Sequence, residues 1–230
     1  MEVVILCGGK GTRLSEYTED IPKPLVEIGN KPIIHYLMDL YASFGHKDFI
    51  LCIGYKGSKI KEYFKDNKEF NIRFVDSGEN ANKAERLLKA KDLIRDETFL
   101  MSYGDDLADV DINNVIAFHK KNRKIVTLTA VPLESPFGII EVNGKGEVIS
   151  FKEKPKLNHW MNGGFYVIDK KIFNYIKKGH DLEKGAFEEL AKEKNIAAFM
   201  HNGFWKSMNT LKDVIELNEL YKKGITPWIK

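Results

Sequence analysis

Short apolar runs alternate with stretches of helical apolar spacing over the first 131 residues. The apolar runs are rich in β-branched residues, which is typical of strands buried on both faces of a sheet. The expected strands are 2–7, 48–54, 71–77, 98–105 and 125–131. The expected helices between them are 32–44, 58–65, 81–95 and 111–121. This alternation predicts an α/β fold with a mostly parallel, Rossmann-like sheet covered by helices on both faces.

The pattern changes after residue 131. FGIIEV and VISF flank the turn NGKGE, which predicts a β-hairpin over 137–151. A strand at 162–168, two helices, a further strand and a closing helix at 211–222 follow. No repeat or linker interrupts the pattern, so we expect one domain over 1–230 with a small β-rich lobe.

Composition narrows the class of protein. Of 230 residues, 43% are hydrophobic and 30% are charged, which is typical of a folded globular chain. The net charge of +3 is not concentrated in a basic block, so nucleic acid is not an expected partner. The start MEVVILCGG lacks the features of a signal peptide or membrane span, which favours a cytoplasmic chain with no membrane partner. Cys7 and Cys52 are expected to be buried, reduced thiols.

The stretch ILCGGKGTRLSEYTEDIPKPL, residues 5–25, has the glycines and cations of a phosphate-binding loop. It does not follow the dinucleotide-binding fingerprint GxGxxG, because the sixth position counted from Gly9 is Leu14. It does not follow the P-loop pattern either, because Gly11 is followed by Thr12 rather than by lysine.

A third arrangement fits this stretch better: a glycine loop at the carboxyl end of the first strand, where ligands bind open α/β sheets. Backbone N–H groups would face a nucleotide, and Arg13 and Lys23 would face its phosphates. Pro22 and Pro24 fix the backbone on either side of Lys23 and disfavour a helix. We therefore expect Lys23 on a stiff, extended segment.

Several motifs together resemble one family. LCGGKGTRL…PKPLVEIGNKPII resembles the opening of the sugar-1-phosphate nucleotidylyltransferases. YGDDLADVDI is similar to the aspartate-bearing strand end of that family, and FGIIEV…ISFKEKP…MNGGFYVI to its acceptor segment. VDSGENANKAERL and GFWKSMNTLKDVIELNELYKKGITPW resemble the glucose-1-phosphate cytidylyltransferase branch. The resemblance covers almost all of residues 1–230.

The resemblance implies an enzyme in which a phosphate oxygen attacks the α-phosphorus of a nucleoside triphosphate and releases pyrophosphate. The protein would supply positioning and positive charge, and Mg²⁺ would bridge the phosphates. The implied substrates are CTP and a small phosphorylated metabolite such as glucose 1-phosphate, for surface polysaccharide or capsule synthesis. About residues 1–131 would bind the nucleotide, and about 132–230 would bind the acceptor and close the chain. A homo-oligomer is one alternative, but the oligomeric contacts of the branch do not carry over to this chain, so the oligomeric state stays open.

The resemblance also assigns residues. Arg13, Lys23 and Lys154 are the expected catalytic residues, because they would hold the phosphates on both sides of the reaction. The expected nucleotide-binding residues are Leu6, Gly8, Gly9, Gly11, Thr12, Arg13, Lys23, Arg86 and Asp105. The expected acceptor-binding residues are Gly138, Glu153, Lys154, Asn162, Gly163 and Glu183. Asp105 and Asn209 are the expected metal ligands.

Some of these residues have a competing structural explanation. Arg86 resembles an arginine that reads cytosine, yet it lies on an expected helix whose solvated face it could occupy. Glu183 could reach an acceptor hydroxyl or serve only the fold. Asp106 stands where the family usually has glycine, and a turn or helix cap is its expected role. Asn162 can bond hydroxyls, and Gly163 would let a ligand approach closely.

Other side chains are expected to be structural. His35, His119 and His201 lack partners at ligand spacing in the sequence. The tryptophans Trp160, Trp205 and Trp228 are expected to pack, with Trp205 the best candidate for stacking on a ligand.

Two departures leave the substrates open. Asn209 stands where the family usually has a metal-binding aspartate, and the passage from IKEYFKDNKEF to NIRFVDSGE is shorter than in the cytidylyltransferase branch. A non-sugar acceptor such as phosphoglutamine therefore stays open, and so does another triphosphate: dTTP, UTP or GTP. A nucleotide-sensing module that has lost catalysis is the alternative from another class of protein.

Overall fold

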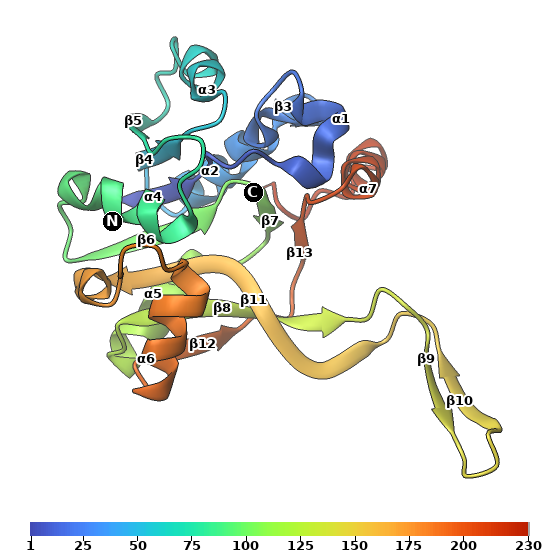
Figure 1. Ribbon diagram of the computed structural model, residues 1–230. Helices are drawn as coiled ribbons and strands as arrows, with labels where there is room; N and C mark the ends of the chain where they lie inside the picture. The colour runs from blue at the N-terminus through green and yellow to red at the C-terminus, as the bar shows by residue number, and fades with distance from the viewer. Residues whose placement is uncertain (230) are drawn as a thin grey trace.

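Seven strands form the central sheet of the computed structural model, which describes residues 1–229 (Figure 1). Their order across the sheet is β12-β8-β11-β6-β1-β4-β5. Neighbouring strands are parallel except where β11 pairs with β6 and β8. The strands are β1 (Val3–Leu6), β4 (Asp48–Ile53), β5 (Asn71–Asp76), β6 (Thr98–Tyr103), β8 (Val126–Glu134), β11 (Lys156–Asp169) and β12 (Ile196–Met200).

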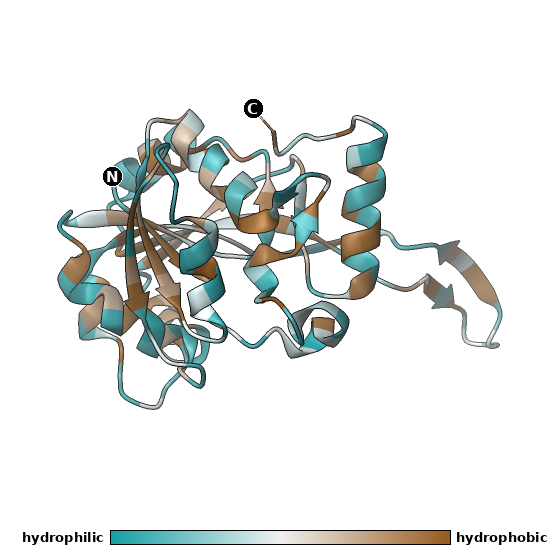
Figure 2. Cartoon of the chain, turned by 90° about the horizontal axis from the view of Figure 1, so that it is seen from above, coloured by the Kyte–Doolittle hydropathy of each residue, from teal (hydrophilic) through white to brown (hydrophobic). Residues whose placement is uncertain are grey.

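Helices cover both faces of this sheet because each buries one apolar stripe. The apolar residues of α2 (Ile33–Ser43), α3 (Gly57–Tyr63) and α5 (Ile112–Asn122) pack on one face. Those of α4 (Lys83–Ala90) and α6 (Glu188–Lys192) pack on the other. In Figure 2 the strands between these helices are coloured as hydrophobic. The fold class predicted from the sequence is confirmed.

Shorter elements connect these layers. The helical turns are η1 (Thr12–Leu14), α1 (Ser15–Thr18), η2 (Lys23–Leu25), η3 (Lys91–Leu93), η4 (Lys170–Asn174) and η5 (Leu182–Phe187). The short strands are β2 (Glu27–Ile28), β3 (Lys31–Pro32), β7 (Asp106–Ala108), β9 (Ile139–Val142), β10 (Val148–Lys152) and β13 (Trp205–Ser207). The closing helix α7 (Leu211–Lys222) contributes Val214 and Leu217 to a third apolar cluster, which also holds Trp228.

The backbone around Lys23 differs from the sequence-based expectation. Lys23 is the first residue of the 3₁₀ turn η2 and not part of an extended segment. Pro22 is extended, with φ −67° and ψ 144°, and Pro24 lies inside the turn. A proline in the first turn of a helix sacrifices no hydrogen bond, because the N–H groups there have no intrahelical acceptor. The PKP motif therefore starts a turn where we expected it to prevent one.

The β9–β10 hairpin projects from the body of the protein (Figure 1). We call residues 137–154 the arm. Its apolar side chains include Phe137, Ile149 and Phe151, which are 74%, 64% and 65% exposed. Hydrophobic colour also extends onto this hairpin in Figure 2. The arm therefore carries the three most exposed large apolar side chains of the described residues.

Parallel pairing brings two loops together at one edge of the sheet. β1 pairs with β6, and Leu6 lies beside Tyr103 at the carboxyl ends of the two strands. The loops that follow, 7–11 and 104–105, must therefore meet at this edge, where open α/β sheets bind ligands. Among residues 1–229, no helix combines the length and the apolar character that crossing a bilayer requires.

Candidate active site

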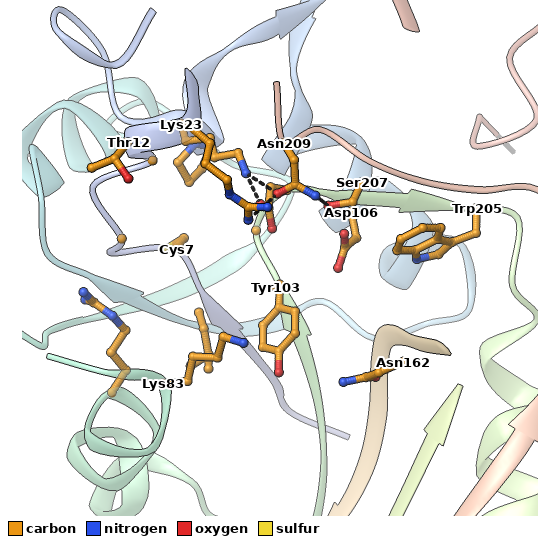
Figure 3. Close-up of a pocket in the computed structure, with 18 residues that line it drawn as sticks. Cys7, Thr12, Lys23, Lys83, Tyr103, Asp106, Asn162, Trp205, Ser207 and Asn209 are labelled. Atoms are coloured by element: carbon orange, nitrogen blue, oxygen red, sulfur yellow. Dashed lines mark hydrogen bonds and ion pairs between the residues drawn. The ribbon is translucent and has the colours of Figure 1, made fainter. Parts of the chain in front are cut away.

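A cavity of about 440 Å³ lies at this edge (Figure 3). The predicted site residues that line it are Leu6, Gly9, Gly11, Thr12, Arg13, Lys23, Arg86, Asp105, Asn162 and Asn209. They come from the end of β1, the glycine loop, the turns η1 and η2, α4, the β6–β7 connection, β11 and the residues before α7. The fold thus gathers most of the predicted nucleotide-binding residues, which are distant in the sequence, around one cavity.

Two glycines of the loop are required by their surroundings. Gly11 has a left-handed backbone with φ +64°, and a Cβ there would lie 2.9 Å from Thr18 Cγ2 and 3.0 Å from Lys23 Cβ. A Cβ on Gly8 would collide with the guanidinium of Arg86. Gly8 itself does not line the cavity. Gly11 lets the loop fold closely over Lys23, and Gly8 makes room for Arg86.

Four polar side chains form a contact cluster on one side of the cavity. Lys23 makes an ion pair with Asp105, and its Nζ also donates to Asn209 Oδ1 at 3.1 Å. Arg13 Nη2 donates to the same Asn209 oxygen at 2.8 Å. Figure 3 shows these contacts as dashed lines. The neutral amide of Asn209 thus accepts hydrogen bonds from two cations, at the position where the family usually has a charged aspartate.

The cap of α7 holds Asn209 in place. Thr210 and Asp213 form a capping box at the start of the helix. Asp213 Oδ2 also accepts the backbone N–H of Asn209 at 3.0 Å, and Asn209 Nδ2 donates to Ser207 Oγ at 2.9 Å. The amide oxygen is thereby left to face Arg13 and Lys23.

Asp106 belongs to the cavity, and the expected turn or helix-cap role is wrong. It begins strand β7, lines the cavity and is 3% exposed. Gly164, with φ +77°, makes room for it, since a Cβ at that position would collide with Asp106 Oδ2. Burial, and then the neighbouring Asp105, raises the pKa of Asp106 well above its ordinary value.

Arg86 is buried, so the solvated helix face considered above is wrong for this residue. It is 4% exposed. Its Nη1 donates to Ser77 Oγ at 2.6 Å and to the carbonyl of Gly78 at 3.1 Å, and its Nη2 donates to the carbonyl of Glu79 at 3.3 Å. Burial lowers the pKa of Arg86. The guanidinium is therefore fixed at one side of the cavity by a serine hydroxyl and two backbone carbonyls.

A chain of hydrogen bonds connects Asn162 to Glu183. Asn162 Nδ2 donates to Tyr166 Oη at 2.6 Å, Tyr166 donates to Tyr103 Oη at 2.8 Å, and Tyr103 donates to Glu183 Oε1 at 2.6 Å. Lys83 makes an ion pair with Glu183, and its Nζ lies 4.6 Å from the centre of the Tyr103 ring. Glu183 therefore supports Lys83 and Tyr103 and does not itself line the cavity.

The remaining predicted acceptor residues lie outside the cavity. Gly138, Glu153 and Lys154 belong to the arm, and Glu153 and Lys154 are exposed. Lys154 has a left-handed backbone with φ +45°, which is uncommon for a residue with a side chain. Gly163 is buried in the sheet, where a Cβ would lie 3.0 Å from the carbonyl oxygen of Thr129, so packing explains this glycine without a ligand.

Sequence reasoning missed several residues that line the cavity: Cys7, Pro24, Lys83, Tyr103, Gly104 and Ser207. One of them left a signal in the sequence. Lys83 precedes Arg86 by three residues on α4, so the two share a helix face. Trp205, the stacking candidate, also lines the cavity, where its Nε1 donates to the carbonyl of Gly163 at 2.7 Å.

The other aromatic, thiol and histidine expectations have mixed outcomes. Cys7 and Cys52 are buried and unpaired, as expected. Trp228 is 2% exposed and packs in the core, and His119 is buried against Thr127. The packing expected of Trp160 is wrong, since this side chain is 45% exposed. The statement that His35 and His201 lack partners is also wrong: two carboxylates lie within 4 Å of His35, and Asp109 Oδ1 lies 3.0 Å from His201.

A cavity at the edge of an α/β sheet, with convergent cations and carboxylates, is typical of an enzyme site for a charged small molecule. The chain belongs to the nucleotidyl transferase family, whose profile matches residues 2–224. It is 41% identical to the "Glucose-1-phosphate cytidylyltransferase" of Salmonella typhimurium, over 99% of this chain and 98% of that one. It is 39% identical to the "Probable glucose-1-phosphate cytidylyltransferase" of Bacillus subtilis, over 99% of both. The fold is similar to that of HddC from Yersinia pseudotuberculosis, with a TM-score of 0.74, 24% identity and coverage of 96% of this chain and 99% of that one.

Proposed function

We propose that the protein is a cytidylyltransferase that joins CTP and a sugar 1-phosphate, such as glucose 1-phosphate, into a CDP-sugar and pyrophosphate. The observation that carries this proposal is the cluster of Arg13, Lys23, Asp105 and Asn209 in the cavity of a chain about 40% identical to two proteins named for that reaction. The proposed setting is surface polysaccharide or capsule synthesis in the cytoplasm.

In the proposed reaction a phosphate oxygen of the acceptor attacks the α-phosphorus of CTP. The bond from that phosphorus to the oxygen that bridges it to the β-phosphate breaks, and pyrophosphate leaves with the electron pair. Arg13 and Lys23 now donate to one neutral amide oxygen, and a triphosphate oxygen is a stronger acceptor for both. Binding CTP would therefore replace two contacts with a neutral oxygen by two ion pairs with phosphate.

The oxygen donors beside these cations fit Mg²⁺. Asp105 and Asp106 supply carboxylates and Asn209 supplies an amide oxygen, and hard oxygen ligands are those that Mg²⁺ prefers. Mg²⁺ held there with the triphosphate would neutralise phosphate charge as pyrophosphate leaves. The buried Asp106 carboxylate has a raised pKa, and a cation beside it would favour its ionised form.

The proposed acceptor side combines cavity and arm. Asn162 and Trp205 lie in the cavity and would contact the acceptor body, while Lys154 and Glu153 of the arm would hold its phosphate and hydroxyls. The positive φ of Lys154 is shared by Lys56, Arg123 and Lys194, so the proposed role of Lys154 rests on the resemblance of FKEKP to the acceptor segment of the family. The exposed apolar side chains of the arm support a homo-oligomer in which a second copy of the chain covers them.

The test is pyrophosphate release from CTP, UTP, dTTP and GTP, each with glucose 1-phosphate and with phosphoglutamine. CTP with glucose 1-phosphate is expected to be the best pair. Arg86→Ala should reduce the preference for CTP more than it reduces turnover, whereas Arg95→Ala, which removes an exposed arginine outside the cavity, should change neither. Equal rates with CTP and UTP would contradict the base assignment, and no release from any pair would favour the nucleotide-sensing alternative.

A further inference from the structure

A histidine and two carboxylates, none of which lines the cavity, converge on the surface near the start of α2. His35 Nε2 lies 3.7 Å from Asp39 Oδ1 and 3.5 Å from Glu69 Oε2. His35 and Asp39 are four residues apart on the helix and share one face. Glu69 comes from the turn between α3 and β5. The three ligand atoms all lie within 4.8 Å of one another.

The imidazole of His35 is held in one orientation. Its Nδ1 is 2.7 Å from Tyr63 Oη, and its ring packs against Tyr63, Phe64 and Phe70 with centroid distances of 5.8, 6.0 and 5.5 Å. This arrangement leaves Nε2 facing the two carboxylates. Metal-binding histidines are held in the same way, through a hydrogen bond of the nitrogen that does not bind the metal.

The carboxylates are also placed by their neighbours. Lys31 Nζ lies 3.0 Å from Asp39 Oδ2, so the other oxygen, Oδ1, faces the histidine. Asn67 Oδ1 accepts the backbone N–H of Glu69 at 3.1 Å and fixes the turn that carries it. Lys31 is paired with Asp39 and not with Glu69, so the two carboxylates together leave negative charge beside the histidine that favours a cation.

We propose that His35, Asp39 and Glu69 bind a divalent transition-metal ion, with Zn²⁺ as the best fit, that ties α2 to the turn before β5. Ligands about 2.0–2.1 Å from a tetrahedral Zn²⁺ stand roughly 3.3–3.4 Å from one another. The two nitrogen–oxygen distances of 3.5 and 3.7 Å need only a small contraction, and the two carboxylate oxygens, which lie within 4.8 Å of each other, would approach by rotation of the exposed Glu69 side chain. A nitrogen ligand selects such ions over Mg²⁺ and Ca²⁺, which prefer oxygen. The site is separate from the proposed catalytic metal.

The test is binding of Zn²⁺ to the full chain in excess Mg²⁺, which keeps the cavity supplied with its own metal. The readouts are the rise in Tm with added Zn²⁺ and the visible absorption of Co²⁺ as a spectroscopic substitute. We expect one ion per chain. Tyr63→Phe should weaken binding by about tenfold or more, because it removes the partner of Nδ1.

The deciding variants are Glu69→Gln and Asp39→Asn, which are both expected to abolish the Zn²⁺ effect. Glu69 is 68% exposed, so its substitution should not disturb folding. The matched control is Glu62→Gln, which changes a carboxylate that is 69% exposed on neighbouring α3 and should bind Zn²⁺ like the unaltered chain. Equal Zn²⁺ affinity in all four proteins, or no Zn²⁺ effect in the unaltered chain, would overturn the proposal.

Discussion

Arg13 in the cavity and Lys154 on the arm are both proposed to hold phosphate, but their surroundings differ. Arg13 contacts Asn209, which the cap of α7 fixes, and lies in a cavity built from the ends of β1 and β6. Lys154 is exposed and follows a hairpin whose apolar side chains face solvent. The residues proposed to bind the nucleotide thus meet around a cavity within one chain, whereas the arm residues proposed to bind the acceptor lie outside that cavity. We propose that a second copy of the chain covers the arm and so completes the acceptor side.

The largest effect is expected from Lys23→Met, which tests the contact cluster in the cavity. Methionine keeps the buried stem but removes the charge that contacts Asp105 and Asn209. Turnover should fall by about a hundredfold to a thousandfold, as when one preorganised electrostatic donor is lost. Pyrophosphate release at saturating CTP and acceptor measures it. Lys10→Met, in the same loop but outside the cavity, is the control and should keep normal turnover. A fully active Lys23→Met protein would show that Lys23 does not contribute to the reaction.

Lys154→Ala tests the other side of the comparison. If Lys154 grips the acceptor phosphate, its loss should raise the KM for the acceptor by about tenfold to a hundredfold, the effect of losing a hydrogen bond to a charged group. The KM for CTP should stay nearly constant. Lys152→Ala, which removes a second exposed cation of the arm, is the control. A rise in the KM for CTP alone would show that Lys154 contacts CTP and not the acceptor.

Substitutions of exposed apolar residues on the arm test whether a second copy of the chain covers this surface. Ile149→Ser together with Phe151→Ser removes two side chains that are 64% and 65% exposed in the single chain. If a second copy covers them, the dissociation constant of the oligomer should rise by about tenfold or more, because buried aromatic anchors dominate interfaces. Sedimentation velocity over a concentration series measures this. Ile225→Ser, at an exposed apolar residue elsewhere, should leave the association unchanged. Unchanged association of the arm variant would leave the oligomer proposal without its surface.

The cavity and the arm also differ in how much of each could be predicted from the sequence. Periodicity predicted the sheet, and the parallel pairing of β1 with β6 makes the positions of Arg13 and Asp105 at one edge a consequence of that pattern. Whether a polar side chain turns inward is not encoded in local pattern. Asp106 follows Asp105 and looked like a turn residue, yet it is buried because Gly164, 58 positions later, leaves room for it. Contacts of this range depend on the assembled sheet.

The hydrogen-bond chain below the cavity shows the same limit. Tyr103 and Tyr166 are ordinary strand residues in sequence, and the antiparallel pairing of β11 with β6 brings their hydroxyls together. The arm was predicted as a hairpin from FGIIEV, NGKGE and VISF, and it is one. Its projection could not be predicted, because local pattern does not specify which surface an exposed hairpin packs against.

The smallest effect is expected from Asp106→Asn, and it is a gain in stability. Burial, with Asp105 beside it, raises the pKa of Asp106 above its ordinary value of 3.8, so ionising this carboxyl costs more in the folded chain than in the unfolded one. The folded state therefore binds more protons than the unfolded state between 3.8 and the raised value. Stability falls as pH rises through that window and stays lower above it.

Asparagine carries no charge and keeps an oxygen to accept the hydrogen bond of Ser207. The gain should therefore be absent below about pH 3.8, grow as pH rises and level off at roughly 0.5–2 kcal/mol, the usual range for one stabilising substitution. Urea unfolding of both proteins at several pH values, without nucleotide or Mg²⁺, measures it. A gain that is the same at every pH would assign the effect to packing instead of charge. Because Asp106 would lose its stability cost when a cation binds beside it, added Mg²⁺ and CTP should narrow the difference between the two proteins. If the full difference in unfolding free energy persisted with both ligands bound, Asp106 would lie outside the metal site. Asp105 would then be the one carboxylate of the cavity available to the metal.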